Sequence, residues 1–206
     1  MVSSGWLAGL PPWDNRALFP GAAMALKSTV FKAELQVADL DRGHFADYAL
    51  TVARHPSEND ERMMVRILAF ALHAGPDLAF GKGLSSDDEC ALQEVDPSGV
   101  LQTWIEVGQP DETRIRKGCH RARRAVVLTY GARSVDVWWQ QIAPQLARFD
   151  NLTVLRLSAE ETQALGALAE RSMRLSCTVQ EGTVWLSAGE HSLQLHPDTL
   201  LSPNAG

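Results

Sequence analysis

Apolar and polar residues alternate in two segments near the start of the chain, as they do in β-strands with one buried face. Residues 26–37 carry Leu35 and Val37 among polar neighbours, and residues 45–53 alternate strictly. A polar turn at residues 39–43 separates the two segments. We therefore predict an antiparallel β-hairpin.

The hydrophobic period changes from strand to helix after Pro56. Ser57 is the predicted N-cap of a helix that runs to about Ala74, where glycine and proline follow. Glu58 and Glu61 fall in the first turn of this helix, where acidic side chains commonly stabilise the helix dipole. The apolar stripe of the helix consists of Met64, Ile67, Leu68, Ala71 and Leu72.

The middle of the chain alternates short apolar runs with amphipathic segments. A strand within residues 90–95 and a turn at residues 96–99 lead into the buried strand that holds Glu106. Pro110 and the two acids after it then begin a strongly basic helix that reaches about Arg124. The pattern continues with a strand at 125–130, a helix at 135–149, a strand at 151–157 and a helix at 158–169.

Three strands joined by two tight turns end the chain, over residues 174–180, 183–187 and 191–196. Strand–helix–strand segments require a parallel crossover, which is almost always right-handed, whereas the hairpins add antiparallel pairs. We therefore predict a mixed α/β fold in which a central mixed β-sheet is flanked by helices and antiparallel hairpins lie at both ends.

The composition fits one globular domain. The 206 residues are 45% hydrophobic, and a chain of this size can bury most of its unfolded surface in one core. We assign this domain to residues 24–206. Residues 1–23 contain three prolines and no apolar period, so we predict a disordered N-terminal extension. A translation start at Met24 is the alternative.

The cysteines and the hydropathy indicate a cytoplasmic protein without a membrane partner. Cys90, Cys119 and Cys177 form no CxxC pair, which argues against a disulfide framework and against a cysteine zinc site. No apolar run approaches the roughly 18 residues that a membrane span requires. The first residues also lack the basic start and the apolar core of a signal peptide.

The net charge of −6 argues against a generally basic nucleic-acid-binding protein, because nonspecific affinity comes largely from the neutralisation of phosphates. Local binding remains open, since six of the nineteen Lys and Arg residues lie between positions 114 and 124. On the predicted helix these cations occupy the half opposite the apolar face. Arg114, Lys117, Arg121 and Arg124 are therefore candidate nucleic-acid-binding residues.

Glu106 is the main candidate for chemistry. It is a lone carboxylate among Trp104, Ile105 and Val107, where burial is costly unless the charge is paired. Two interpretations are open. The carboxylate either reaches solvent or an arginine such as Arg114, or it binds a metal ion.

A metal site would need further carboxylates close to Glu106, and the sequence offers two sources. One or more of Asp87, Asp88 and Glu89 lie on or just before the neighbouring hairpin strand, and Glu58 or Glu61 lies on the preceding helix. Two or three carboxylates around Mg²⁺ or Mn²⁺ are the arrangement by which nucleases activate water.

Several long segments resemble one family of small bacterial proteins. The segments are MALKSTVFKAELQVADLDRGHF, ARHPSENDERMMVRIL, WIEVGQPDETRIRK, VDVWWQQ and GTVWLS, and together they extend from Met24 to about Leu200. They look like the YaeQ family. The fold of that family resembles the core of the PD-(D/E)XK restriction endonucleases, a mixed sheet with flanking helices.

The resemblance implies roles for particular residues. Glu106 matches the second acid of the PD-(D/E)XK pattern, Asp88 or a neighbour would be the first, and Glu58 or Glu61 would match a helical glutamate. The lysine expected two residues after the acid is absent, because Gly108 stands there. Two residues could compensate for this absence: Lys117, from the following helix, and Gln109, which is close to the acid.

Three hypotheses follow for the function. The first is a Mg²⁺- or Mn²⁺-dependent nuclease that uses Glu106, a hairpin acid and a helical glutamate to act on DNA or RNA. The second is a non-catalytic binding or regulatory protein that retains the nuclease-like fold and binds nucleic acid or an acidic protein. The third treats residues 114–124 as a solvated structural face that is paired internally with acids.

Overall fold

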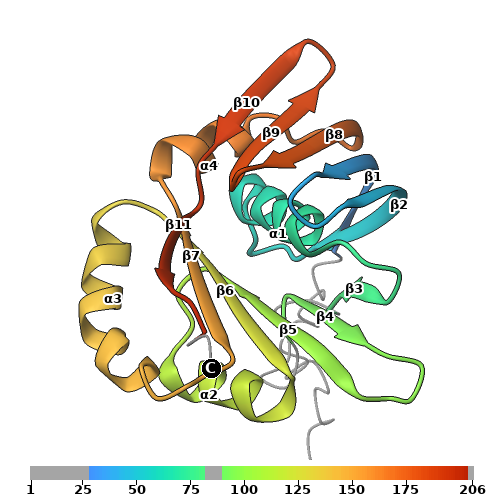
Figure 1. Cartoon of the computed structure of the whole chain (residues 1–206). Helices are drawn as coiled ribbons and strands as arrows, with labels where there is room; N and C mark the ends of the chain where they lie inside the picture. Colours follow the sequence, from blue (N-terminus) through green and yellow to red (C-terminus); the bar gives the residue numbers. More distant parts are fainter. Residues whose placement is uncertain (1–27, 82–89, 204–206) are drawn as a thin grey trace, which may run out of the picture.

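The computed structural model describes residues 28–81 and 90–203, and these residues form two β-sheets and four α-helices (Figure 1). The first sheet has the strand order β10-β9-β8-β1-β2. Its strands are β1 (Thr29–Asp39), β2 (His44–Arg54), β8 (Ser172–Gln180), β9 (Thr183–Ala188) and β10 (His191–Leu195). Strand β1 pairs antiparallel with β2 and parallel with β8, so both ends of the domain contribute to this sheet.

The second sheet has the strand order β11-β7-β6-β5-β4-β3. Its strands are β3 (Leu78–Phe80), β4 (Leu92–Val95), β5 (Leu101–Val107), β6 (Arg124–Tyr130), β7 (Leu152–Leu157) and β11 (Asp198–Leu201). Strands β5, β6 and β7 are parallel to one another, so their carboxyl ends lie along one edge of the sheet. We call this the carboxyl edge.

Three of the four helices begin at the carboxyl edge. Helix α2 (Glu112–Arg121) follows β5, α3 (Arg133–Leu146) follows β6, and α4 (Ala159–Gly166) follows β7. Ser158 and Glu161 form a capping box that fixes the start of α4. Helix α1 (Asp60–His73) connects the first sheet to β3.

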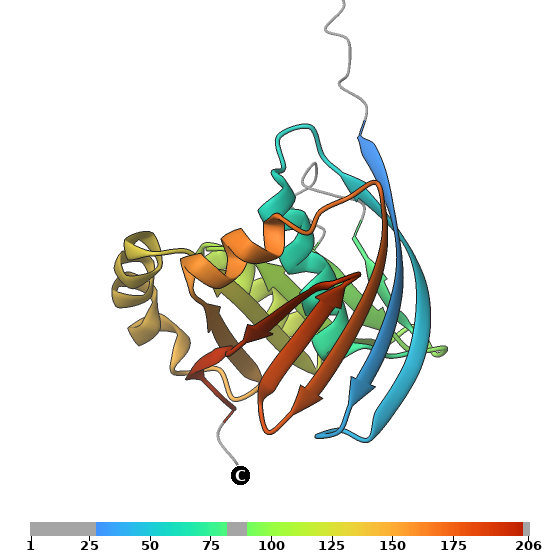
Figure 2. The same cartoon turned by 90° about the horizontal axis from the view of Figure 1, so that it is seen from above.

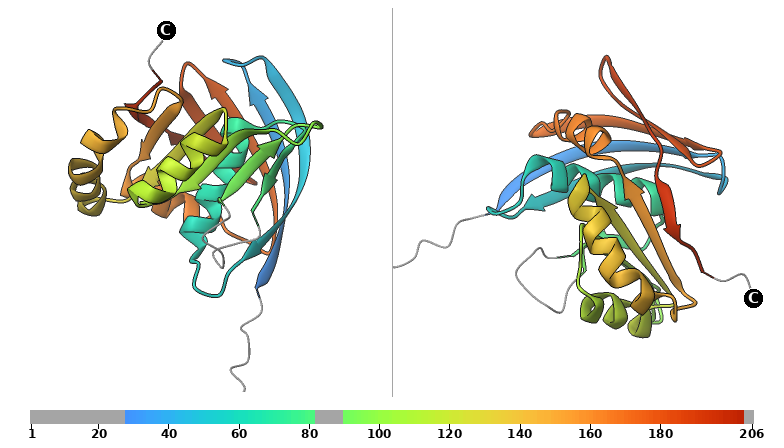
Figure 3. Two further views of the ribbon diagram at one scale, coloured as in Figure 1. Left: turned by 90° about the horizontal axis from the view of Figure 1, so that it is seen from below. Right: turned by 90° about the vertical axis from the view of Figure 1, so that its left-hand side faces the viewer.

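Helix α1 lies between the two sheets and is the centre of the larger hydrophobic core (Figures 1 and 2). Its residues 63–71 are all buried. This core joins side chains of the first sheet, such as Leu35, to Ile105 and Leu128 of the second sheet. On the opposite face of the second sheet, α2 and α3 cover a smaller core through Ile115 and Ile142 (Figure 3).

The predicted mixed α/β fold is confirmed, and the structure adds details that the pattern did not contain. The two terminal hairpins pair with each other through β1 and β8, which makes them one separate sheet. Helix α1 is capped by Asn59, whose side chain accepts a hydrogen bond from the backbone of Arg62, and not by Ser57. The short edge strands β3 and β11 were not expected. Within the described part of the chain, no helix is both long and apolar enough to cross a membrane.

Candidate functional site

Glu106 is buried at the carboxyl end of β5 and is held by two donors. Its side chain is 3% exposed, the indole Nε1 of Trp104 donates to Oε1 over 2.9 Å, and the Arg114 Nε lies 2.8 Å from the same oxygen. Burial raises the pKa of Glu106 above its ordinary value, while the hydrogen bond and charge of Arg114 and the bond from Trp104 oppose this rise. The arginine partner that the sequence offered as one interpretation is therefore present.

The packing of α2 on β5 explains how Trp104 and Arg114 reach this acid. Trp104 lies beneath α2, where Gly118 leaves room for the indole ring, since a Cβ atom at Gly118 would stand 2.6 Å from the Trp104 Cδ1. Arg121 covers the same ring with its guanidinium carbon 5.6 Å from the ring centroid. One face of α2 thus places Arg114 and Arg121 on either side of the Trp104–Glu106 pair.

Glu58 lies just before α1 and is paired with Arg66. Arg66 donates from Nε and Nη2 to the two carboxylate oxygens over 2.8 and 2.7 Å, and both residues are buried. Arg66 also donates to the Ala53 carbonyl over 2.9 Å. The Arg62 Nε lies 3.8 Å from Glu58. Glu58 therefore belongs to a buried bidentate ion pair that ties α1 to β2.

Glu61 and Gln109 line a cavity of about 450 Å³ at the carboxyl edge. Glu61 accepts a hydrogen bond of 2.5 Å from Thr162 Oγ1 on α4. Gln109 is exposed, and its Nε2 donates to Ser134 Oγ over 3.1 Å. Arg62 connects this cavity to β5, because its Nη1 donates to the Val107 carbonyl over 2.8 Å.

The cations of α2 and its C-terminal end occupy a continuous segment that is largely exposed. Arg116, Arg121, Arg123 and Arg124 are exposed, and Arg114 and Lys117 are partly buried. Several of them also have protein partners: Arg116 pairs with Glu112 over 3.0 Å, and Arg124 donates to Thr103 Oγ1 over 3.1 Å. We call the four exposed arginines the basic surface.

The candidate acids that the structure describes, Glu58, Glu61 and Glu106, are not gathered into one cluster. Residues 28–81 and 90–203 contain no group of three His, Cys, Asp or Glu side chains that could hold a metal ion. Asp88, like Asp87 and Glu89, lies outside the described residues. The chain continues from that segment into Ala91, whose backbone N–H donates to the Ile105 carbonyl over 3.0 Å. The described chain therefore resumes beside the strand of Glu106.

Sequence reasoning missed the arginines that partner these acids. Arg66 stands in an apolar run, where a cation is costly unless it is paired, and this could have pointed to Glu58 as its partner. Arg62 and Tyr130, which line the cavity, were also not singled out. Their signal was indirect: Gly108 and Gly131 directly follow two parallel strands, where a ligand can approach the backbone.

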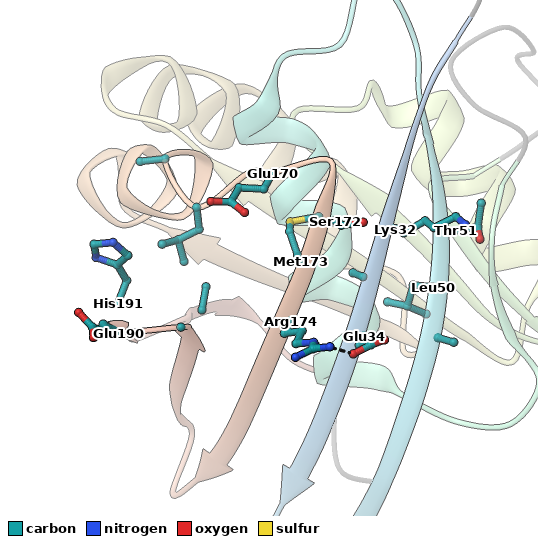
Figure 4. A pocket seen from close by; sticks show the side chains of 16 residues that line it. Lys32, Glu34, Leu50, Thr51, Glu170, Ser172, Met173, Arg174, Glu190 and His191 are labelled. Atoms are coloured by element: carbon teal, nitrogen blue, oxygen red, sulfur yellow. Dashed lines mark hydrogen bonds and ion pairs between the residues drawn. The ribbon is translucent and has the colours of Figure 1, made fainter.

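A larger hollow of about 880 Å³ lies on the first sheet, away from every predicted site residue (Figure 4). Strands β1, β2 and β8 and the turn between β9 and β10 surround it. Its charged groups are of both signs, and Glu34 and Arg174 form an exposed ion pair of 3.1 Å across it. The three described cysteines are buried. Burial, together with the charge of Glu106, raises the pKa of the Cys90 thiol to about 12.

Comparison of the sequence with known proteins identifies relatives of this chain. The model of the YaeQ protein family matches residues 24–197. The "Uncharacterized protein YaeQ" of Escherichia coli (strain K12) is 45% identical over 173 residues, which are 84% of this chain and 96% of the relative. Its counterpart in Salmonella typhi is 45% identical over 172 residues, covering 84% of this chain and 95% of the relative.

Two crystal structures share the fold. The YaeQ protein from Xanthomonas axonopodis pv. citri has a TM-score of 0.83 and 48% identity, over 85% of this chain and 99% of that chain. The YaeQ protein from Pseudomonas syringae has a TM-score of 0.81 and 35% identity, over 85% of this chain and 97% of that chain.

Proposed function

Because the chain belongs to the YaeQ family, whose fold resembles the PD-(D/E)XK nuclease core, we propose that it is a cytoplasmic nucleic-acid-binding protein that binds without a metal ion. The observation that supports this proposal is the salt bridge of 2.8 Å between Arg114 and Glu106. The central acid of the nuclease pattern is engaged by a cation of the basic helix, so its negative charge is balanced within the protein.

The basic surface is the feature that would contact phosphates. Arg116, Arg121, Arg123 and Arg124 lie within nine residues of one another and are exposed, and exposed guanidinium groups make bidentate contacts with phosphate oxygens. The overall charge of −6 does not oppose this role, because an exposed cluster determines the field near itself. In this proposal, Glu106 is a positioning residue. It holds Arg114 by the salt bridge, and it holds the indole ring of Trp104, which Arg121 covers.

Fluorescence anisotropy tests this proposal. The ligands are labelled single-stranded and duplex DNA and RNA, and each is titrated in EDTA and in Mg²⁺. We expect binding in EDTA that weakens as salt rises, and the double variant Arg121→Ala/Arg124→Ala to lower the affinity by about tenfold and to flatten the salt dependence. Arg174→Ala is the control, because Arg174 is an exposed arginine on the first sheet, away from the basic surface. Equal losses in both variants, or no binding to any of the four substrates, would refute the proposal. Salt-sensitive capture of an acidic protein in its place would point to the protein-binding alternative.

A second candidate function is metal-dependent cleavage of nucleic acid, with Asp88, Glu106, Glu58 and Glu61 as ligands of Mg²⁺ or Mn²⁺ and with Lys117 or Gln109 in the place of the missing lysine. Two observations favour it: Glu61 and Gln109 share one cavity, and Ala91, where the described chain has just resumed, is hydrogen-bonded to Ile105 of β5. Metal binding would require Arg114 and Arg66 to release their acids. Metal titration followed by cleavage assays tests it, and cleavage that Glu106→Ala leaves undiminished would rule out this site.

A further inference from the structure

The cavity at the carboxyl edge lies where open α/β sheets commonly bind their ligands. It is bounded by the start of α1, by the residues that follow β5 and β6, and by the first turns of α4. Crevices at the carboxyl ends of parallel strands are the usual ligand position in such sheets, because the loops there are free to carry functional groups. Its volume of about 450 Å³ is within the range of small-molecule sites.

Two glycines keep this cavity open. Gly108 follows β5 with φ of +97°, and Gly131 follows β6 with φ of +124°, and both values favour glycine. A Cβ atom at Gly108 would lie 2.8 Å from Arg62 Nη1, and one at Gly131 would lie 3.3 Å from Ser134 Oγ. A side chain at either position would therefore press against the polar groups that line the cavity.

The polar groups on one side of the cavity are donors. Arg62 has Nη1 on the Val107 carbonyl, while its buried Nε makes no hydrogen bond in the described chain and lies 3.8 Å from the Glu58 carboxylate. Gln109, Ser134 and Tyr130 also line the cavity, and the Gln109 Nε2 donates to Ser134 Oγ over 3.1 Å and to the Tyr130 carbonyl over 3.4 Å. The Ser134 hydroxyl accepts from Gln109 and keeps its own proton for donation to a ligand. A guanidinium together with an amide and a hydroxyl is a donor set that suits the oxygens of a phosphate group.

The remaining lining argues for a ligand larger than a bare anion. Glu61 lines the same cavity, and although one of its oxygens accepts from Thr162, its charge would repel a phosphate placed beside it. Gln163 adds an amide with both donor and acceptor capacity. A nucleotide meets both requirements, because its phosphate can face Arg62 and its sugar hydroxyls and base amino groups can donate to Glu61.

We propose that the cavity formed by Arg62, Gln109, Tyr130, Ser134, Glu61 and Gln163 binds the phosphate monoester of a nucleotide, either as a free mononucleotide or as the terminal phosphate of a nucleic acid. The second source rests on the proposed function, whereas the first does not. The site is separate from the basic surface, which lies on α2 and its C-terminal end.

Calorimetric titration with the four ribonucleoside 5′-monophosphates and the four matching nucleosides tests the cavity directly. We expect a mononucleotide to bind at least tenfold more tightly than its nucleoside, because the nucleoside has no phosphate to accept hydrogen bonds from Arg62 and the other donors. Gln109→Ala and Ser134→Ala should each lower the affinity for the mononucleotide by about five- to tenfold, and Arg62→Gln should lower it further.

Gln140→Ala is the control, since Gln140 is an exposed amide on α3 that does not line the cavity. Equal binding of nucleotide and nucleoside, no mononucleotide binding, or wild-type affinity in Gln109→Ala and Ser134→Ala would overturn the proposal.

Oligonucleotides with a 5′-phosphate and with a 5′-hydroxyl distinguish the two sources and separate this inference from the proposed function. If the terminal phosphate is the ligand, the 5′-phosphorylated strand binds more tightly, and the cavity variants remove only that preference. Arg121→Ala/Arg124→Ala should instead weaken both strands by the same factor. Mononucleotide binding in the cavity without binding of either strand would support this inference and refute the proposed function. Binding of both strands that no cavity variant changes, together with no mononucleotide binding, would do the reverse.

Discussion

Glu106 lies at the carboxyl end of a parallel strand, in an environment that raises its pKa. Burial raises its pKa from the ordinary value of 4.5, and the partial compensation comes from Arg114, whose side chain is still 28% exposed. A carboxylate with a raised folded-state pKa costs stability once it ionises. The folded protein is therefore relatively more stable below pH 4.5, and this advantage is lost as the pH rises through the raised pKa.

We predict that Glu106→Gln abolishes this loss. The free energy of unfolding of Glu106→Gln relative to the wild type should increase as the pH rises from about 4 to about 8, because the amide keeps an acceptor for Trp104 and does not ionise. Urea unfolding at a series of pH values measures this difference, in which the other titrating groups cancel. A difference that is constant with pH would show that the Glu106 pKa is the same in both states.

Glu106→Ala should destabilise the protein at pH 7. It leaves the buried indole N–H of Trp104 without its acceptor, and a buried donor without a partner costs about 1–3 kcal/mol. Glu106→Gln at the same pH should stay within about 1 kcal/mol of the wild type. Comparison of the two variants by urea unfolding separates the loss of the hydrogen bond from the loss of the charge, and equal destabilisation would contradict this account.

The buried pair of Glu58 and Arg66 is a second residue-scale test. Glu58→Ala leaves Arg66 buried without its carboxylate, and breaking a buried pair in this way typically costs about 3–5 kcal/mol. Glu34→Ala breaks the exposed pair with Arg174 and should change the free energy of unfolding by less than about 1 kcal/mol. Thermal and urea unfolding of both variants measure this contrast, and similar effects would show that Arg66 finds another partner or water.

The sequence singled out Glu106 but did not determine which group engages its carboxylate. Glu106 was identified as an acid that must be paired or bind metal, and its pairing with Arg114 was one of the two interpretations. The choice between them depended on how α2 packs, because Arg114 reaches the acid only where Gly118 lets Trp104 lie under the helix. Such packing at close range leaves no signal in hydrophobic periodicity.

At the scale of the element, the packing of α2 reverses the usual effect of a glycine-to-alanine substitution on stability at Gly118. Replacing a glycine inside a helix with alanine normally stabilises the helix by up to about 1 kcal/mol. Here the new Cβ would stand 2.6 Å from Trp104 Cδ1, so Gly118→Ala should destabilise the protein by about 1–3 kcal/mol. Thr113→Ala, at an exposed position of α2, is the control and should be near neutral. Urea unfolding checks both, and stabilisation by Gly118→Ala would mean that α2 can move away from β5.

Periodicity predicted the elements with a clear apolar pattern and left their partners undetermined. Helix α1 was expected within a few residues of its observed bounds because its stripe is long. The edge strands β3 and β11 have three and four residues, which is too short for a period to be recognised. The parallel pairing of β1 with β8 joins residues about 140 positions apart, so it depends on the whole fold and not on the local pattern.

At the scale of the molecule, α1 makes the two sheets one cooperative unit. The same buried core contains Leu35 and Val52 from the first sheet, Ile105 and Leu128 from the second, and the buried stretch 63–71 of α1 between them. Neither sheet could bury its inner face without α1, since α1 covers both. We therefore expect the domain to unfold in a single transition.

The two sheets carry separate reporters for this expectation, because Trp185 lies on β9 of the first sheet and Trp104 on β5 of the second. With fluorotryptophan incorporated and the two signals assigned by Trp185→Phe and Trp104→Phe, urea unfolding followed by ¹⁹F NMR should give both residues the same midpoint. Leu128→Ala removes a fully buried side chain of the second sheet and should cost about 2–5 kcal/mol. In one cooperative unit, Leu128→Ala lowers the midpoint at Trp185 as much as at Trp104.

The control is Val137→Ala at an exposed position of α3, which should change neither midpoint. A fall at Trp104 alone would show that the first sheet with α1 is stable without the second, and that the second sheet can open locally around Glu106 while the rest of the domain stays folded.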